Sequence, residues 1–138
     1  MKQIVLLTAL SLLLATTGGA QEVLWTYTPP TGCVDTSPAL GDINGDGQTE
    51  IVLGTTAGLI LALDVHGKEV WRQEMRGPIC FPPTIADVIG DAGLEVLAMN
   101  RQGQVICLQG ATGNVLWKNT FPGSLQWGTT ALAAGDVD

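Results

Sequence analysis

The sequence contains few of the residues from which most enzyme active sites are built. Its 138 residues include one histidine, one tyrosine and three cysteines. His66 lies in the polar turn Asp64-Val65-His66-Gly67, where an exposed side chain is the ordinary expectation, and no Ser-His-Asp set can be assembled around it. The cysteines and the histidine lack zinc-ligand spacing. We therefore predict no catalytic residue, although paired carboxylates for glycoside chemistry remain an alternative.

Basic residues are also scarce, with six Lys and Arg against 13 Asp and Glu, for a net charge of −7. A phosphate backbone requires clustered Lys and Arg, and those of this chain are scattered, so nucleic acid is not expected as a partner. No glycine-rich loop ends in Lys-Ser or Lys-Thr, as a phosphate-binding loop would. Much of the acidity lies in Asp-rich loops, where a bound divalent cation would offset it.

A long apolar run is found only at the N-terminus, and it is too short to span a membrane. Lys2 is followed by the apolar residues 4–14 and then by the small residues Gly18-Gly19-Ala20. This arrangement is typical of a secretory signal peptide, whereas a membrane-spanning helix requires about 20 apolar residues. We predict that residues 1–20 are removed ahead of Gln21 and that the protein is secreted, periplasmic or displayed at the cell surface.

The most informative segment is Gly41-Asp42-Ile43-Asn44-Gly45-Asp46-Gly47-Gln48-Thr49-Glu50, because oxygen donors fall at alternate positions. Ca²⁺ takes about six to eight oxygen ligands, and a nine-residue loop of this kind can surround it. The predicted ligands are side-chain oxygens of four residues and one backbone carbonyl, namely Asp42, Asn44, Asp46, Glu50 and the carbonyl of Gln48. A short apolar run follows at 51–54 where an EF-hand would have a helix, so the loop is expected to join two strands. A solvated turn is the alternative.

The chain repeats one unit with a period near 46 residues. Trp25, Trp71 and Trp117 are 46 residues apart both times, and Asp42, Asp87 and Asp136 precede comparable segments. A tryptophan that recurs once per unit is expected to pack between units rather than to bind sugar. Trp127 breaks the period and is the better candidate for a ligand contact.

Four short strands per unit, with Gly-rich turns and this period, indicate an all-β fold made of β-propeller blades, each a four-stranded antiparallel sheet. The first blade is expected at about 37–74, the second at about 82–119, and the start of a third at about 129–138. The predicted strands are 37–41, 50–54, 58–63 and 68–74, then 82–86, 95–99, 104–108 and 114–119. A closed propeller has about four to eight blades, so this is an incomplete propeller that needs further blades or partner surfaces to close.

The second loop, residues 87–95, has fewer oxygen donors. Ile89 replaces the first loop's asparagine, and Ala92 replaces its second glycine. The remaining candidates for a weaker metal site are Asp87, Asp91, Gly93 and Glu95. Fewer charged oxygens imply weaker binding, or a plain turn between strands.

Asp42-x-Asn44-x-Asp46-Gly47-x-x-Glu50 resembles the calcium loop of FG-GAP (VCBS, integrin α-type) propeller repeats. Residues 58–71 and 103–117 are similar to the repeat of pyrroloquinoline-quinone-type propellers. The resemblance implies a propeller fold and Ca²⁺. It does not imply the quinone, because the vicinal cysteines expected of a quinoprotein dehydrogenase are absent.

The resemblance leaves two functional readings. The first is an exported, calcium-stabilised module that binds or scaffolds, with a protein or carbohydrate ligand, and is not itself an enzyme. The alternative is the N-terminal part of a secreted polysaccharide-active enzyme of the lyase type, since some such enzymes are built on FG-GAP-like propellers. Among the cysteines, Cys33 and Cys80 occupy similar places in neighbouring units, so a disulfide between them is an open alternative, while Cys107 is expected to be a buried thiol.

Overall fold

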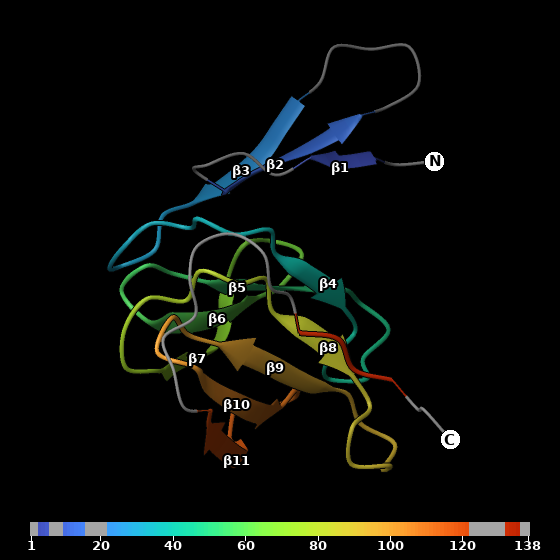
Figure 1. Ribbon diagram of the computed structural model, residues 1–138. Coiled ribbons are helices and arrows are strands. Elements are labelled where there is room, and N and C mark those ends of the chain that lie inside the picture. The colour runs from blue at the N-terminus through green and yellow to red at the C-terminus, as the bar shows by residue number, and fades with distance from the viewer. Residues whose placement is uncertain (1–2, 6–9, 16–21, 122–131, 136–138) are drawn as a thin grey trace.

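The computed structural model describes residues 3–5, 10–15, 22–121 and 132–135, and the regular structure in these ranges is entirely β. Two sheets have four antiparallel strands each, in the orders β4-β5-β6-β7 and β8-β9-β10-β11. They lie face to face as consecutive propeller blades (Figure 1). The first contains β4 (Ala39–Gly41), β5 (Glu50–Gly54), β6 (Leu59–Leu63) and β7 (Glu69–Glu74). The second contains β8 (Thr84–Ala86), β9 (Glu95–Met99), β10 (Gln104–Gln109) and β11 (Val115–Thr120).

The predicted all-β fold and the four-stranded blades are confirmed. The predicted strands at 50–54 and 95–99 agree residue for residue with β5 and β9, five others differ by one or two residues at one end, and the last is displaced by one residue at both ends. β5, β6 and β9 are buried along their whole length, which explains why they read as continuous apolar runs instead of alternating. Gly58 and Gly103 have positive φ (88° and 78°) in the hairpin turns that follow β5 and β9.

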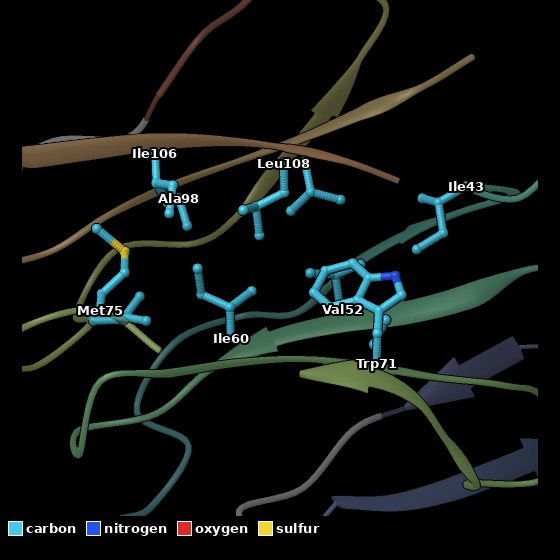
Figure 2. Packing of buried hydrophobic residues seen from close by; sticks show 11 residues of the cluster. Ile43, Val52, Ile60, Trp71, Met75, Ala98, Ile106 and Leu108 are labelled. Carbon is cyan, nitrogen blue, oxygen red and sulfur yellow. The ribbon is translucent and has the colours of Figure 1, made fainter. Parts of the chain in front are cut away.

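The main core lies between the two blades (Figure 2). Val52, Ile60 and Ala62 of the first blade face Ala98 and Ile106 of the second. Four of these five side chains have no exposed surface, and Ile106 is 3% exposed. Burying one large apolar side chain contributes about 1.5–3 kcal/mol, so this interface is the main source of stability for the pair. The two outer faces are covered by short segments, which are Trp25, Tyr27 and Val34 on one side and Leu132 and Ala134 on the other.

The repeated tryptophans hold one unit to the next. The Trp71 indole N–H donates to the Gly110 carbonyl at 2.6 Å, and a Cβ on Gly113 would lie 2.7 Å from the Trp71 ring. Trp25 repeats the arrangement, since it donates to the Val65 carbonyl at 2.9 Å and its ring covers Gly67. The predicted packing role of Trp71 is thereby confirmed. Trp71 is 8% exposed, whereas Trp117, the next in the series, is 41% exposed.

A third sheet precedes the blades, with the order β1-β2-β3. Its strands are β1 (Gln3–Val5), β2 (Leu10–Ala15) and β3 (Glu22–Tyr27), the last of which carries Trp25. The sequence placed residues 1–20 outside the fold, whereas in the full chain residues 10–15 pair with β3 and residues 3–5 pair with residues 10–15. Removal of a signal peptide stays a prediction, and it would leave β3 as the first strand. Within the described ranges, no helix has the length and apolarity needed to cross a membrane.

Residues 132–135 are the described part of the predicted third-blade start at 129–138. Leu132 and Ala134 pack on the cluster that contains Leu97 and Cys107, and the Thr84 hydroxyl donates to the Leu132 carbonyl at 2.7 Å. The segment therefore lies against the inner part of the second blade, where the sequence repeat places the next blade. The rest of that segment, and Trp127, lie outside the described residues.

All three cysteines are free thiols, so the Cys33–Cys80 disulfide that the sequence left open is not formed. Cys33 is exposed and its sulfur lies 3.4 Å from the Thr56 hydroxyl, while Cys80 is half-buried. Cys107 is fully buried. Burial, aided by the nearby Glu95 carboxylate, raises the pKa of the Cys107 thiol to about 11.

The native protein should therefore show thiols of very different reactivity toward dithionitrobenzoate. At about pH 8, a thiol with this pKa is only about 0.1% ionised, and the thiolate is the reacting species. We expect Cys33 to react first, Cys33→Ser to remove that phase, and Cys107 to react only after denaturant is added. Reaction of all three thiols at one rate in the native protein would contradict the burial of Cys107.

Candidate metal centre

The loop between β4 and β5 is organised around Asp42. Its Oδ1 accepts backbone N–H groups from Gly45 at 2.7 Å and Asp46 at 3.1 Å, and its Oδ2 accepts the N–H of Gly47 at 2.9 Å. Gly45 and Gly47 have φ of 77° and 83°, a conformation that only glycine adopts without strain. The oxygen donors at alternate positions therefore lie in a compact loop that is coiled around the Asp42 carboxylate, and not in an extended turn. A carboxylate offers about four acceptor positions, so Asp42 retains room for one more partner.

Asn44 and Asp46 extend this network of hydrogen bonds from backbone N–H groups to side-chain oxygens. Asn44 Oδ1 accepts the N–H of Asp46 and Asp46 Oδ1 accepts the N–H of Gln48, both at 2.8 Å. The Asn44 amide nitrogen donates at 3.3 Å to both Asp46 Oδ2 and Glu50 Oε1. The amide therefore lies between two carboxylates that would otherwise repel each other. This is the position in which a cation would relieve the same repulsion.

Glu50 closes the loop from inside the protein. Its side chain is 1% exposed, and Oε2 accepts the backbone N–H of Ile43 at 3.0 Å. Burial raises the pKa of Glu50, the Ile43 N–H partly counters this, and the negative charges of Asp46 and Asp42 raise the pKa further. The ionised carboxylate is thus held at an energetic cost. A divalent cation beside it would remove that cost.

Four of the five predicted ligands border a cavity of about 230 Å³, and Asp42 is not among its lining residues. Asn44, Asp46, Gln48 and Glu50 form one wall. Asp64 and His66 line the same cavity, so the turn histidine lies near the acidic loop. Among the described residues, no three His, Cys, Asp or Glu side chains form a ready-made metal group. The predicted set instead includes an amide and a backbone carbonyl, and its oxygen donors fit a hard cation such as Ca²⁺.

The second loop keeps the frame but has fewer donors. Glu95 is 1% exposed and its Oε2 accepts the N–H of Val88 at 2.9 Å, which repeats the contact made by Glu50. Asp87 accepts the Gly90 N–H and Asp91 accepts the Gly93 N–H, both at 2.7 Å. Ile89, in place of the asparagine, is 49% exposed and offers no oxygen. The buried glutamate therefore has a structural role in both loops, whether or not a cation binds.

Two arrangements were not anticipated from the sequence. Thr55 and Asn100, 45 residues apart, are buried polar residues that organise the hairpins after β5 and β9. The Thr55 hydroxyl accepts the Leu59 N–H, and Asn100 Oδ1 accepts the N–H groups of Gln102 and Gln104. The available signal was a polar residue three positions before each turn glycine. In addition, a cavity of about 350 Å³ lies between the two acidic loops and is lined by Asp42 and Asn44 of one and Asp91 and Glu95 of the other.

Comparison with known proteins assigns the fold to a family. Residues 50–124, more than half of the chain, match the model of the lambda-carrageenase beta-propeller domain. The chain belongs to this family. Residues 35–64, which contain the whole first loop, match the FG-GAP repeat, so the resemblance noted from the sequence is confirmed.

Two curated relatives are lambda-carrageenases, one from Pseudoalteromonas sp and one from Pseudoalteromonas carrageenovora. Each is 27% identical over 71 residues, which is 51% of this chain and 7% of the relative. The chain therefore spans a small part of the length of the curated relatives that it matches. At this identity and coverage, the relation supports a propeller module and assigns it no specific role.

Solved structures show the same fold. BamB from Moraxella catarrhalis matches with a TM-score of 0.59 at 21% identity, over 86% of this chain and 34% of BamB. A europium-containing methanol dehydrogenase matches with a TM-score of 0.56 at 21% identity, over 85% of this chain and 22% of the enzyme. Both likenesses concern the propeller architecture alone.

Proposed function

We propose that this chain is a calcium-stiffened propeller module of an exported protein, and that it binds or scaffolds instead of carrying out chemistry. The observation that carries the proposal is the loop coiled around Asp42, in which two acidic side chains, Asp42 and Asp46, and the Asn44 amide lie near the buried Glu50. Ca²⁺ would supply a cross-link between β4 and β5. Asp42, Asn44, Asp46, Glu50 and the Gln48 carbonyl would hold it.

A polysaccharide-acting protein is the favoured context for this module. The support is the match to the lambda-carrageenase propeller family and the two relatives named as lambda-carrageenases. A parent protein that acts outside the cell on a large polysaccharide also suits the predicted export signal. In this context the propeller would contribute a body and a binding surface, and the reacting groups would come from other parts of the parent protein.

The metal proposal predicts a calcium-dependent gain in stability that Asp46→Ala removes. Calcium at about a hundred times its Kd should stabilise the full chain by about 2.7 kcal/mol, because it binds the folded state. Thermal melting of parent and Asp46→Ala in calcium and in chelator measures the difference. Asp91→Ala at the matching position of the second loop is the control, and it should have the smaller effect. Equal melting temperatures of parent and Asp46→Ala, both in calcium and in chelator, would contradict the proposed calcium site.

A further inference from the structure

The first acidic loop contains the one Asn-Gly pair of the chain, Asn44-Gly45. The side-chain amide of an asparagine is attacked most readily by the backbone nitrogen of a following glycine, because glycine has no Cβ to hinder the approach. Both residues are exposed, and a Cβ built on Gly45 would meet nothing within 4 Å. The pair is therefore open to this reaction in the folded protein.

Hydrogen bonds of the loop fold the Asn44 side chain over the peptide that follows it. Asn44 Oδ1 accepts the N–H of Asp46 at 2.8 Å, which closes a ring that contains the Asn44 amide carbon and the Gly45 nitrogen. The Gly45 N–H itself donates to Asp42 Oδ1 at 2.7 Å. The attacking nitrogen, the amide carbon and an acceptor for the departing proton thus belong to one turn.

The other three asparagines are less favourable. Asn100 is 1% exposed, and its amide nitrogen donates to a backbone carbonyl. Asn114 and Asn119 are exposed, but each precedes a β-branched residue of β11. A β-branched side chain crowds the backbone nitrogen of its own residue. Asn114 and Asn119 are therefore exposed comparators within the same chain.

Asp46-Gly47, two residues later in the loop, repeats the arrangement with a carboxylate in place of the amide. Asp46 Oδ1 accepts the Gln48 N–H at 2.8 Å, so the same kind of turn is formed. At neutral pH a carboxylate is ionised, and its negative charge resists a nucleophile that the neutral amide admits. Asn44 is therefore the residue of this loop that should react first.

We propose that Asn44 is a deamidation site and that its conversion changes the charge of the acidic loop. The Gly45 nitrogen bonds to the amide carbon of Asn44, and its proton passes to the Asp42 carboxylate, which already accepts this hydrogen, and then to water. The bond between the amide carbon and the amide nitrogen breaks, and ammonia leaves with a proton taken from water. Water then opens the succinimide, at one carbonyl to give aspartate and at the other to give isoaspartate. Isoaspartate lengthens the main chain by a methylene group.

The reaction removes a donor that lies between two carboxylates. The Asn44 amide nitrogen donates at 3.3 Å to both Asp46 Oδ2 and Glu50 Oε1, and an aspartate at this position replaces the donor by a further negative charge. Without a cation, the like charges repel and destabilise the loop. With calcium, a charged oxygen in place of a neutral one strengthens binding. The calcium effect rests on the proposed metal site, whereas the deamidation does not.

The test follows the full chain during storage at neutral pH in chelator. Samples are digested at low pH, the peptides are analysed by mass spectrometry, and enzymatic methylation detects isoaspartate. We expect Asn44 to be lost about tenfold faster or more than Asn114 or Asn119, because the glycine nitrogen is unhindered and the loop is exposed. The matched control, Asn44→Gln, retains an amide and the charge of the loop. It should react far more slowly, because its longer side chain cannot form the five-membered ring.

A parallel sample in saturating calcium separates this proposal from the metal proposal. A bound ion would fix the Asn44 oxygen and oppose local opening, so we expect the loss to slow about tenfold or more. Rapid loss of Asn44 at one rate in calcium and in chelator would support the deamidation site and contradict Asn44 as a calcium ligand. Two results in chelator would overturn the deamidation proposal. One is loss of Asn44 only after denaturant is added, and the other is loss of Asn44 and Asn114 at similar rates.

Discussion

Trp71→Ala should lower the free energy of unfolding by about 3–5 kcal/mol, the usual cost of deleting a buried aromatic side chain. The ring fills the space over Gly113 between the blades, and its N–H satisfies the Gly110 carbonyl. Loss of the side chain leaves a cavity in the main core and leaves that carbonyl without its donor. Urea unfolding of the full chain, followed by far-ultraviolet circular dichroism, measures the change without relying on tryptophan fluorescence.

Trp117→Ala is the control for this prediction, because it deletes the same side chain at the same position of the repeat. Trp117 is 41% exposed, so its deletion removes less buried surface, and we expect a loss of about 1 kcal/mol or less. Should Trp71→Ala fail to fold, Trp71→Phe retains most of the ring, and its smaller loss can be measured. Equal effects at the two positions would contradict the assignment of Trp71 to the interface between blades.

Glu50 has two roles that different substitutions separate. Glu50→Ala removes the acceptor of the Ile43 N–H and should cost about 1–3 kcal/mol even in chelator, because a buried donor is left unpaired. In calcium, the proposed gain of about 2.7 kcal/mol is lost as well, so the difference from the parent grows.

Glu50→Gln should show the opposite sign in the two conditions. Folding raises the pKa of Glu50 above its value in the unfolded chain. At pH values above the unfolded-state pKa, the ionised carboxylate therefore destabilises the folded state, and this penalty disappears as the pH falls below the unfolded-state pKa. The neutral amide keeps an acceptor for Ile43 without this penalty. At neutral pH, the variant should therefore match or exceed the parent in chelator and fall below it in calcium. Thermal melting in both conditions measures the crossover.

The same substitution in the second loop, Glu95→Gln, tests whether that loop takes up a cation. Glu95 makes the equivalent backbone contact, but the loop has an exposed isoleucine where the first has asparagine. If the second loop is a plain turn, the stability of this variant relative to the parent should be the same in calcium and in chelator. A crossover at Glu50 together with none at Glu95 would assign the ion to the first loop. The absence of a crossover at Glu50 would leave the glutamate with its structural role alone.

The blade architecture was predictable because the sequence states it more than once. Each described hairpin within the blades has a glycine where the backbone requires positive φ, and the central strands β5, β6, β9 and β10 are mostly apolar runs of β-branched and aliphatic residues. The period of the tryptophans identified the repeat, and packing between blades followed from it. The N-terminal segment was harder, since an apolar run that reads as an export signal also pairs with β3 in the full chain. Local sequence does not distinguish an export signal from a β-strand in this segment, because each requires only apolar residues.

By itself the sequence determined the all-β propeller, the repeat and the alternate oxygen donors of the first loop, since these depend on spacing and residue type along the chain. Only the tertiary structure decided that the Glu50 and Glu95 side chains are buried and have a structural role, and that Cys33 and Cys80 remain free thiols. It also decided that Trp71 is buried while Trp117 is exposed. Burial is decided by what lies across from a residue in space. Trp71 and Trp117 lie at equivalent positions of β7 and β11, and it is the packing across from each that differs.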